Sequence, residues 1–228
     1  MNKTINTVLF DLDGTLVETV HEISDATNDT LEEIGVSQVS EDQVRSWIGH
    51  GTRELLINAL AHVKQVPELE IRQSKGLNDI FKIFDDFYLM RCGTRSHLYP
   101  GVKEVLDSFK SAGLKMAVVT NKESRFTKAV MKSHGLDTYF KIVVSGDTLT
   151  TKKPDPQGIF FCLEKLSASP SQAIFIGDSL VDAKTAQNAG LAVWLLPYGY
   201  NMGQPLQNAN ADLILDSFND LLKLLNIV

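Results

Sequence analysis

The stretch Val8–Leu16, which reads Val-Leu-Phe-Asp-Leu-Asp-Gly-Thr-Leu, decides how the rest of this chain is interpreted. Its apolar start is typical of a buried strand, which reads as a short and nearly continuous hydrophobic run. The run ends on two carboxylates, Asp11 and Asp13, and residues two apart on an extended chain point the same way. Two carboxylates this close need a cation or a shared proton to offset their repulsion. The stretch therefore predicts an acidic pair at the rim of a sheet, where open α/β folds bind ligands.

The composition limits what kind of protein this is. The 228 residues are 43% hydrophobic and carry a formal net charge of −6, which argues against a nucleic-acid partner. No apolar run approaches the ~20 residues that a membrane span needs. The segment Met1–Asn6 has no signal-peptide core, and Cys92 and Cys162 cannot build a disulfide framework. We expect a cytoplasmic protein, monomeric or homodimeric, that binds neither nucleic acid nor membranes.

Short apolar runs alternate with helical patterns along most of the chain. Six runs predict strands: Ile5–Phe10, Leu114–Thr120, Ile142–Ser145, Ala173–Gly177, Leu191–Leu196 and Asp212–Leu215. Strands alternating with helices of this length imply parallel pairing and a sheet covered on both faces. The fold class is therefore α/β, with a Rossmann-like, doubly wound parallel sheet.

One interval, between the first strand and Leu114, contains helical patterns and no convincing strand. Apolar residues recur there at helical spacing, and Ser40 with Gln43 resembles a capping box. We expect residues 17–93 to form an all-helical cap domain, and residues 1–16 with 94–228 to form the α/β core. A lid of this kind would exclude water and select substrates.

The ends of the predicted strands carry the polar residues that suit chemistry. Thr120 and Asn121 end the second strand, Lys153 follows the third, and Asp178 follows the fourth, with Asp182 in the next helix. The carboxyl ends of parallel strands lie along one edge of the sheet. Carboxylates, neutral donors and a lysine should therefore gather in one crevice beside Asp11 and Asp13.

These motifs, in this order, resemble the haloacid dehalogenase superfamily, and the likeness spans essentially the whole chain. The helical insertion resembles the C1-type cap of that superfamily. Within it, the likeness is greatest to phosphoglycolate phosphatases. Three stretches carry that narrower likeness: Trp47–Gly51, Tyr99–Val102 and Pro197–Asn201.

The resemblance implies a role for each acidic residue and for one lysine. Asp11 is the expected nucleophile that forms an aspartyl-phosphate, and Asp13 is the expected general acid and then base. Lys153 is expected to neutralise charge on the nucleophile and the phosphoryl group. Mg²⁺ is expected between Asp11, the backbone carbonyl of Asp13 and Asp178, while Asp182 either ligates it directly or orients a bound water.

The resemblance also implies which residues bind substrate. In the core these are Gly14, Thr15, Thr120 and Asn121. In the cap they are Gly49, His50, Gly51 and Arg53, where the loop precedes a helix start that suits an anion. His50 stands where the family usually has a small polar residue, so the exact substrate stays open. Lys122, Ser145 and Ser179 are interpreted as ordinary loop residues.

The favoured interpretation is an Mg²⁺-dependent phosphatase that acts on a small phosphorylated metabolite, with 2-phosphoglycolate as the leading candidate. A phosphatase for sugar phosphates, nucleotides or pyrophosphate on the same scaffold is the nearest alternative. A phosphomutase of the β-phosphoglucomutase type shares the core residues, although His21 does not fall at the spacing expected for its cap histidine. A phospho-accepting signalling receiver is a further alternative, but such chains are shorter and lack a lid.

Overall fold

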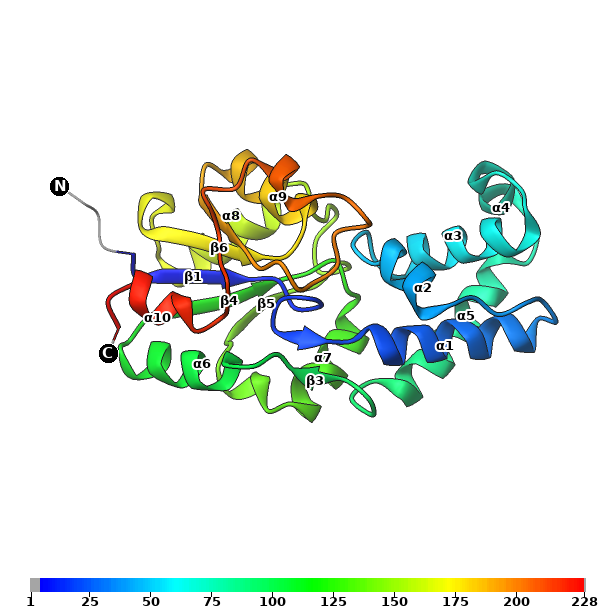
Figure 1. Ribbon diagram of the computed structural model, residues 1–228, viewed down its shortest axis with the longest axis horizontal. Coiled ribbons are helices and arrows are strands. Elements are labelled where there is room, and N and C mark those ends of the chain that lie inside the picture. Colours follow the sequence, from blue (N-terminus) through cyan, green and yellow to red (C-terminus); the bar gives the residue numbers. More distant parts are fainter. Residues whose placement is uncertain (1–4, 228) are drawn as a thin grey trace.

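A parallel sheet of six strands forms one half of the computed structural model, which describes residues 5–227 (Figure 1). The strands are, in spatial order, β5 (Ile142–Val144), β4 (Lys115–Val119), β1 (Thr7–Phe10), β6 (Ala173–Gly177), β7 (Ala192–Leu195) and β8 (Leu213–Ile214). All six predicted strands are confirmed, and every pair in this sheet is parallel. Residues 1–4 and 228, which the sequence assigns to the core, lie outside the described residues.

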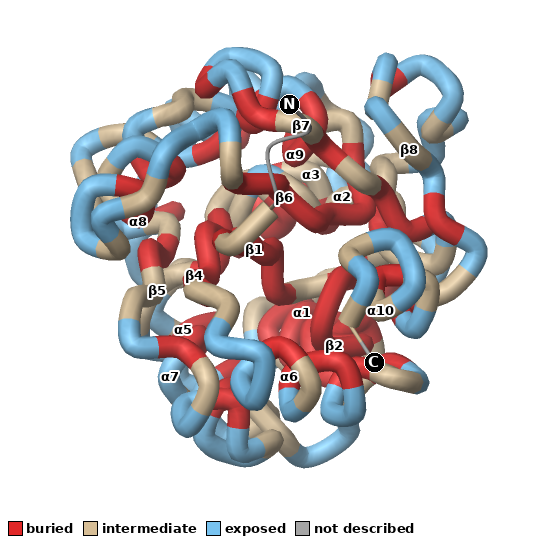
Figure 2. The backbone as a smooth tube through the Cα atoms, turned by 90° about the vertical axis from the view of Figure 1, so that its left-hand side faces the viewer, coloured by how far each residue is buried: buried red, intermediate tan, exposed pale blue. Residues whose placement is uncertain are grey.

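Helices cover both faces of this sheet, so the predicted doubly wound architecture is confirmed. Alternate side chains of β1 point to opposite faces: Val8 and Phe10 pack in one apolar cluster, and Leu9 packs in another. The first cluster includes residues of α6 (Val102–Ser111), α7 (Ser124–Ser133) and α10 (Asp220–Leu224), and the second includes residues of α8 (Gln157–Leu166) and α9 (Leu180–Ala189). Figure 2 shows β1 and β6 buried at the centre. Three short 3₁₀ turns complete the core: Leu136–Thr138, Pro170–Gln172 and Leu206–Ala209.

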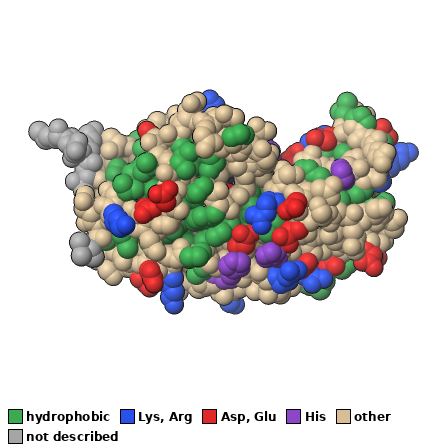
Figure 3. Space-filling view, in the orientation of Figure 1, with side chains coloured by type: hydrophobic (Ala, Val, Ile, Leu, Met, Phe, Trp, Pro, Cys, Tyr) green, Lys and Arg blue, Asp and Glu red, His purple; other side chains and the backbone are tan. Residues whose placement is uncertain are grey.

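The second half of the molecule is helical and has its own apolar cluster. We call it the helical unit, and it consists of α1 (Val20–Glu33), α2 (Glu41–Trp47), α3 (Thr52–Lys64), α4 (Glu68–Gln73) and α5 (Leu77–Arg91). The capping box at Ser40 is confirmed, because Ser40 Oγ accepts from the Gln43 backbone N–H and Gln43 Oε1 accepts from the Ser40 N–H. The helical unit lies beyond the carboxyl end of β1, and the surface is hollowed between the two halves (Figures 1 and 3).

The expectation of no strand between β1 and Leu114 is wrong. Two-residue strands β2 (Val17–Glu18) and β3 (His97–Leu98) pair antiparallel, with Val17 opposite Leu98. Two residues are too few to show the alternation by which a strand is recognised in a sequence. The pair holds together the two chain segments that join the helical unit to the sheet.

In the part of the chain that the structure describes, no helix is both long enough and apolar enough to span a membrane.

Candidate active site

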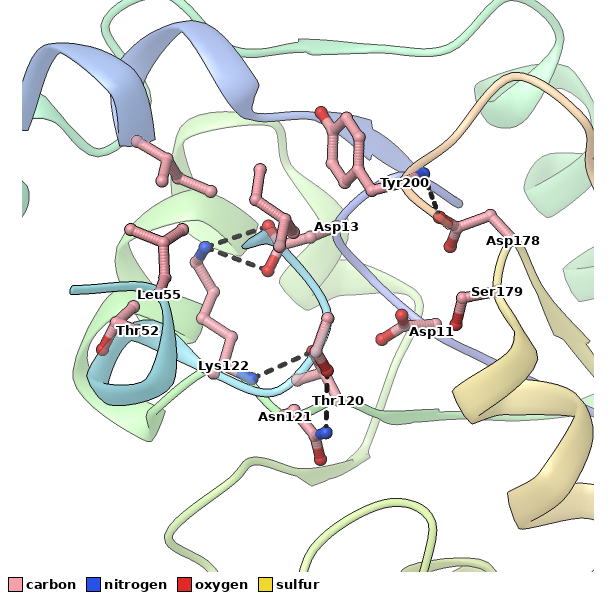
Figure 4. A pocket seen from close by; sticks show the side chains of 14 residues that line it. Asp11, Asp13, Thr52, Leu55, Thr120, Asn121, Lys122, Asp178, Ser179 and Tyr200 are labelled. Carbon is pink, nitrogen blue, oxygen red and sulfur yellow. Dashed lines mark hydrogen bonds and ion pairs between the residues drawn. The ribbon is translucent and has the colours of Figure 1, made fainter. Parts of the chain in front are cut away.

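A small cavity lies where the carboxyl ends of β1, β4 and β6 meet the helical unit (Figure 4). Its volume is about 40 Å³, enough for only a few waters, since one water needs roughly 10–15 Å³ on the same measure. The core and the loop after β7 contribute Asp11, Asp13, Thr120, Asn121, Lys122, Asp178, Ser179 and Tyr200. The helical unit and its loops contribute Ile23, Ile48, Gly49, Gly51, Thr52 and Leu55, none of which carries a charge.

Asp11, Lys153 and Asp182 form a buried line of charges at the sheet edge. Lys153 Nζ lies 2.7 Å from Asp11 Oδ1 and 2.7 Å from Asp182 Oδ1. Burial raises the pKa of Asp11 to about 7, and the carboxylates of Asp182 and Asp13 act in the same direction against the opposing effect of Lys153. The structure thus places one ammonium group beside the carboxylate that directly follows β1.

Asp178 is held rigidly from both of its carboxylate oxygens. Thr15 Oγ1 donates to Oδ1 over 2.6 Å, and the Tyr200 backbone N–H donates to Oδ2 over 2.6 Å. A Cβ added at Gly14 would lie 2.3 Å from Asp178 Oδ2, and one added at Gly199 would lie 2.2 Å from it. Thr15 and Gly14, which the sequence suggests as substrate-binding, therefore contact a neighbouring carboxylate and shape its site.

Asp182 has all of its acceptor capacity directed at the protein. Its Oδ2 accepts from the backbone N–H groups of Asp178 and Ser179 and from Ser179 Oγ, while Oδ1 accepts from Lys153. Ser179 is the N-cap of α9 and forms a capping box with Asp182. The interpretation of Ser179 as an ordinary loop residue is therefore wrong, since its buried hydroxyl fixes the loop that carries Asp178. Ser145 is also buried, and its backbone N–H donates to Thr148 Oγ1.

Three of these buried carboxylates suit a metal ion. One oxygen each of Asp11, Asp178 and Asp182 lies within 4.8 Å of the others. Only Lys153 pairs with this cluster among the salt bridges of the described residues, so negative charge is in excess. Burial, together with the mutual repulsion of the carboxylates, also raises the pKa of Asp178 well above its usual value. Hard oxygen donors with excess negative charge fit a divalent cation such as Mg²⁺.

Lys122 is a functional candidate that the sequence interpretation missed. It is not a solvated loop residue, because only 1% of its side chain is exposed and its Nζ lies 2.9 and 3.0 Å from the two Asp13 oxygens. The same ammonium donates to the hydroxyl of Tyr88 on α5. Thr19 Oγ1 also donates to Asp13, over 2.8 Å. Burial lowers the pKa of Lys122, but the charge and hydrogen bond of Asp13, together with nearby Cys92 and Glu22, outweigh burial and raise that pKa overall.

Thr120 and Asn121 lie where the sequence places them, at the cavity wall. Thr120 Oγ1 accepts from the Lys122 backbone N–H, so the hydroxyl faces the turn that follows β4. Asn121 Nδ2 donates to the carbonyl oxygens of Gly49 and Lys153, at 2.9 and 3.1 Å. Asn121 thus connects the loop before α3 to the loop that carries Lys153.

The two cap side chains expected to bind substrate are not brought to the cavity. His50 is exposed, and its carbonyl accepts from Lys152 Nζ over 2.6 Å. The Arg53 guanidinium donates to Asp85 Oδ2 over 2.7 Å and to the Phe81 carbonyl over 3.1 Å. Neither side chain lines the cavity, whereas Gly49 and Gly51 of the same loop do.

Comparison with known proteins agrees with this arrangement. Residues 8–196 match the family model described as haloacid dehalogenase-like hydrolase. The phosphoglycolate phosphatase of Vibrio cholerae is 40% identical over 225 residues, covering 97% of both chains, and that of Vibrio parahaemolyticus is 38% identical over 98% of this chain and 97% of its own. A crystal structure described as a predicted phosphoglycolate phosphatase from Haemophilus somnus superposes with a TM-score of 0.85, at 32% identity over 96% of this chain and 97% of that one. The chain therefore belongs to the haloacid dehalogenase-like hydrolases.

Proposed function

We propose that this protein is an Mg²⁺-dependent phosphatase that hydrolyses a small phosphomonoester, foremost 2-phosphoglycolate, through an aspartyl-phosphate on Asp11. The observation that carries this proposal is the position of Asp11, 2.7 Å from a buried ammonium and within a cluster of three buried carboxylates. The relatives named phosphoglycolate phosphatase supply the substrate candidate.

In the first half of the reaction an Asp11 oxygen attacks phosphorus, and the bond from phosphorus to the ester oxygen breaks. The electron pair stays on that oxygen, which takes a proton from Asp13 as it leaves as an alcohol. Lys153 offsets negative charge on Asp11 and on the phosphoryl oxygens, and Asp182 fixes the direction of the Lys153 ammonium. We assign the hydroxyl of Thr120, which lines the cavity, to donate to the phosphoryl group.

In the second half a water molecule attacks the aspartyl-phosphate and gives its proton to Asp13, which releases inorganic phosphate and restores the Asp11 carboxylate. Magnesium, for which we assign Asp11, the Asp13 carbonyl and Asp178 as protein ligands, would supply positive charge to the phosphoryl oxygens. We assign Asp182 to Lys153 and to its own loop in place of direct metal ligation, because its oxygens already accept four hydrogen bonds.

The loop before α3 supports a substrate with an anionic end. The backbone at Gly51, before the 13-residue helix α3, presents N–H groups at the positive end of a helix dipole, which suits a carboxylate. We therefore assign recognition of the carboxylate to the backbone of Gly49–Thr52 and not to the side chains of His50 and Arg53.

No observation favours the phosphomutase alternative. His21, the histidine considered for that chemistry, pairs with Glu41 on α2 at 2.7 Å and does not line the cavity.

The direct test measures phosphate release from 2-phosphoglycolate, hexose and pentose phosphates, nucleoside monophosphates and pyrophosphate, with and without Mg²⁺. The Asp11→Asn variant serves as the blank. We expect 2-phosphoglycolate to have the highest kcat/KM and activity to require the metal. Preference for another ester would contradict the substrate, and activity that survives in Asp11→Asn would contradict the mechanism.

A further inference from the structure

The loop after β4 contacts the helical unit through three consecutive residues. Asn121 Nδ2 donates to the Gly49 carbonyl, Lys122 Nζ donates to the Tyr88 hydroxyl, and Glu123 Oε1 accepts from Thr52 Oγ1 over 2.7 Å. Lys122 differs from its two neighbours because its ammonium also contacts Asp13. This single residue therefore joins a carboxylate of the core, with the contact drawn in Figure 4, to Tyr88 on a helix of the helical unit.

The Lys122 ammonium has a complete set of acceptors. It has three hydrogens, and its three acceptors are Asp13 Oδ1, Asp13 Oδ2 and the Tyr88 hydroxyl. Tyr88 is itself fixed, because it is fully buried and its ring lies 4.6 Å from the Phe126 ring and 5.4 Å from the Phe84 ring. A buried ammonium is costly unless it is paired and hydrogen-bonded, so this geometry leaves the ammonium little freedom to move.

Asp13 has no comparable support without Lys122. In the part of the chain that the structure describes, its other side-chain partner is Thr19, whose hydroxyl donates to Oδ1 alone. Both hydrogen bonds to Asp13 Oδ1 and the one to Oδ2 together define the plane of the carboxylate, and the bond to Oδ2 comes from Lys122.

We propose that Lys122 is a positioning residue, which orients the Asp13 carboxylate for proton transfer and is itself held by Tyr88 of the helical unit. This inference rests on the proposed function, since it concerns the proton that Asp13 gives to the leaving alcohol and later takes from water. It assigns to the contact between Tyr88 and Lys122 a role in the reaction: the helical unit must be seated for Asp13 to be aligned.

The test compares two esters that differ in their need for a proton. An alkyl phosphate such as 2-phosphoglycolate needs Asp13 in both halves of the reaction, whereas 2,4-dinitrophenyl phosphate has a leaving group that needs none. In Lys122→Met we expect kcat for the alkyl ester to fall about 100-fold, within the usual contribution of general acid–base catalysis, and KM to stay within about threefold. With the dinitrophenyl ester we expect a rapid burst of about one phenolate per enzyme, then a steady rate at least about tenfold below wild type.

Two further variants separate positioning from a structural effect. Tyr88→Phe removes one hydrogen bond and keeps the charge, so we expect the same kinetic pattern with a loss of about 3- to 10-fold in kcat. This variant also carries the test if Lys122→Met fails to fold, as judged by circular dichroism. Lys152→Met is the matched control, because Lys152 contacts the helical unit at His50 but does not contact Asp13. We expect it to show neither the burst nor the dependence on the leaving group.

Absence of the phenolate burst with the dinitrophenyl ester in Lys122→Met, or wild-type kinetics in Tyr88→Phe, would overturn the inference. A wild-type protein that releases phosphate from neither ester would instead overturn the proposed function, so the two failures are distinguishable.

Discussion

Asp182 accepts a hydrogen bond from Lys153 over 2.7 Å, and both side chains are buried. The other Asp182 oxygen accepts from two backbone N–H groups and one hydroxyl of the loop that carries Asp178. An amide cannot accept on both sides, so Asp182→Asn should misdirect Lys153 and leave its buried ammonium paired with Asp11 alone. We expect kcat to fall about 100-fold and the free energy of unfolding to drop by about 3 kcal/mol. Ser179→Ala, which removes only the capping hydroxyl, should cost about 1 kcal/mol; equal losses in the two variants would contradict this role.

Gly199, in the loop after β7, lies against Asp178 of the carboxylate cluster. A methyl group there would lie 2.2 Å from Asp178 Oδ2, so Gly199→Ala must displace that carboxylate. We expect the Mg²⁺ concentration for half-maximal activity to rise at least about tenfold, since orienting contacts around a metal ligand contribute 10- to 100-fold. Gln204→Ala in the same loop is the control, because that side chain is exposed. An equal rise in the required Mg²⁺ concentration in both variants would contradict this explanation and indicate an effect of the loop as a whole.

The removal of metal should inactivate the enzyme reversibly. We expect EDTA to abolish phosphate release and Mg²⁺ to restore it far better than Ca²⁺, whose larger and looser coordination shell suits in-line transfer poorly. Titration of the EDTA-treated protein with each ion, followed by phosphate release, checks this. Full activity with Ca²⁺ would contradict the assignment of Mg²⁺ as the metal.

Glu22 on α1 should make stability depend on pH. Its Oε2 accepts from the Gly93 N–H over 2.8 Å, but its buried Oε1 has no hydrogen-bond partner among residues 5–227, and burial raises the pKa of Glu22 above the usual 4.5. A raised pKa means that the folded state disfavours the charged form. Glu22 therefore makes the wild type lose stability as pH rises from 4.5 through the raised pKa, and Glu22→Gln removes this contribution. Urea unfolding at several pH values should show the variant gaining relative to wild type with pH; a constant difference would contradict this.

The loop before α3 should select substrate through its backbone. Gly51 has a φ of +91°, and a Cβ there would lie 3.0 Å from the Asn121 carbonyl oxygen. Gly51→Ala should therefore raise KM for 2-phosphoglycolate about tenfold, by the loss of roughly one charge-assisted hydrogen bond. His50→Asn and Arg53→Met should leave KM within about threefold, because neither side chain lines the cavity. A large rise in KM confined to Arg53→Met would contradict this assignment and indicate that the Arg53 side chain binds the substrate.

The sequence predicts the sheet and the cluster of carboxylates because both follow from local patterns. Buried parallel strands are apolar runs, and their polar ends meet at one edge whatever the details of packing. The residues that it does not predict depend on distant partners. Lys122 looks solvated in the sequence, since its burial comes from Tyr88 on α5 and its charge is balanced by Asp13.

Dependence on distant partners also explains why the sequence assigns Thr15 and Arg53 to substrate binding. Thr15 donates to Asp178, which is 163 positions later in the chain, and Arg53 pairs with Asp85, which is 32 positions later. Neither pairing leaves a periodic signal in the sequence, so both residues resemble substrate ligands until the fold brings their partners together.

The pairing of β2 with β3 has a consequence for how such a protein could change its substrate. Because Val17 lies opposite Leu98, the chain enters the helical unit and leaves it at neighbouring points. The segment between these two points is an insertion whose ends are paired, so its length does not affect the spacing of the strands in the six-stranded sheet. One insertion could be exchanged for another in a single recombination event, while Asp11, Asp178 and Lys153 keep their positions at the edge of the six-stranded sheet.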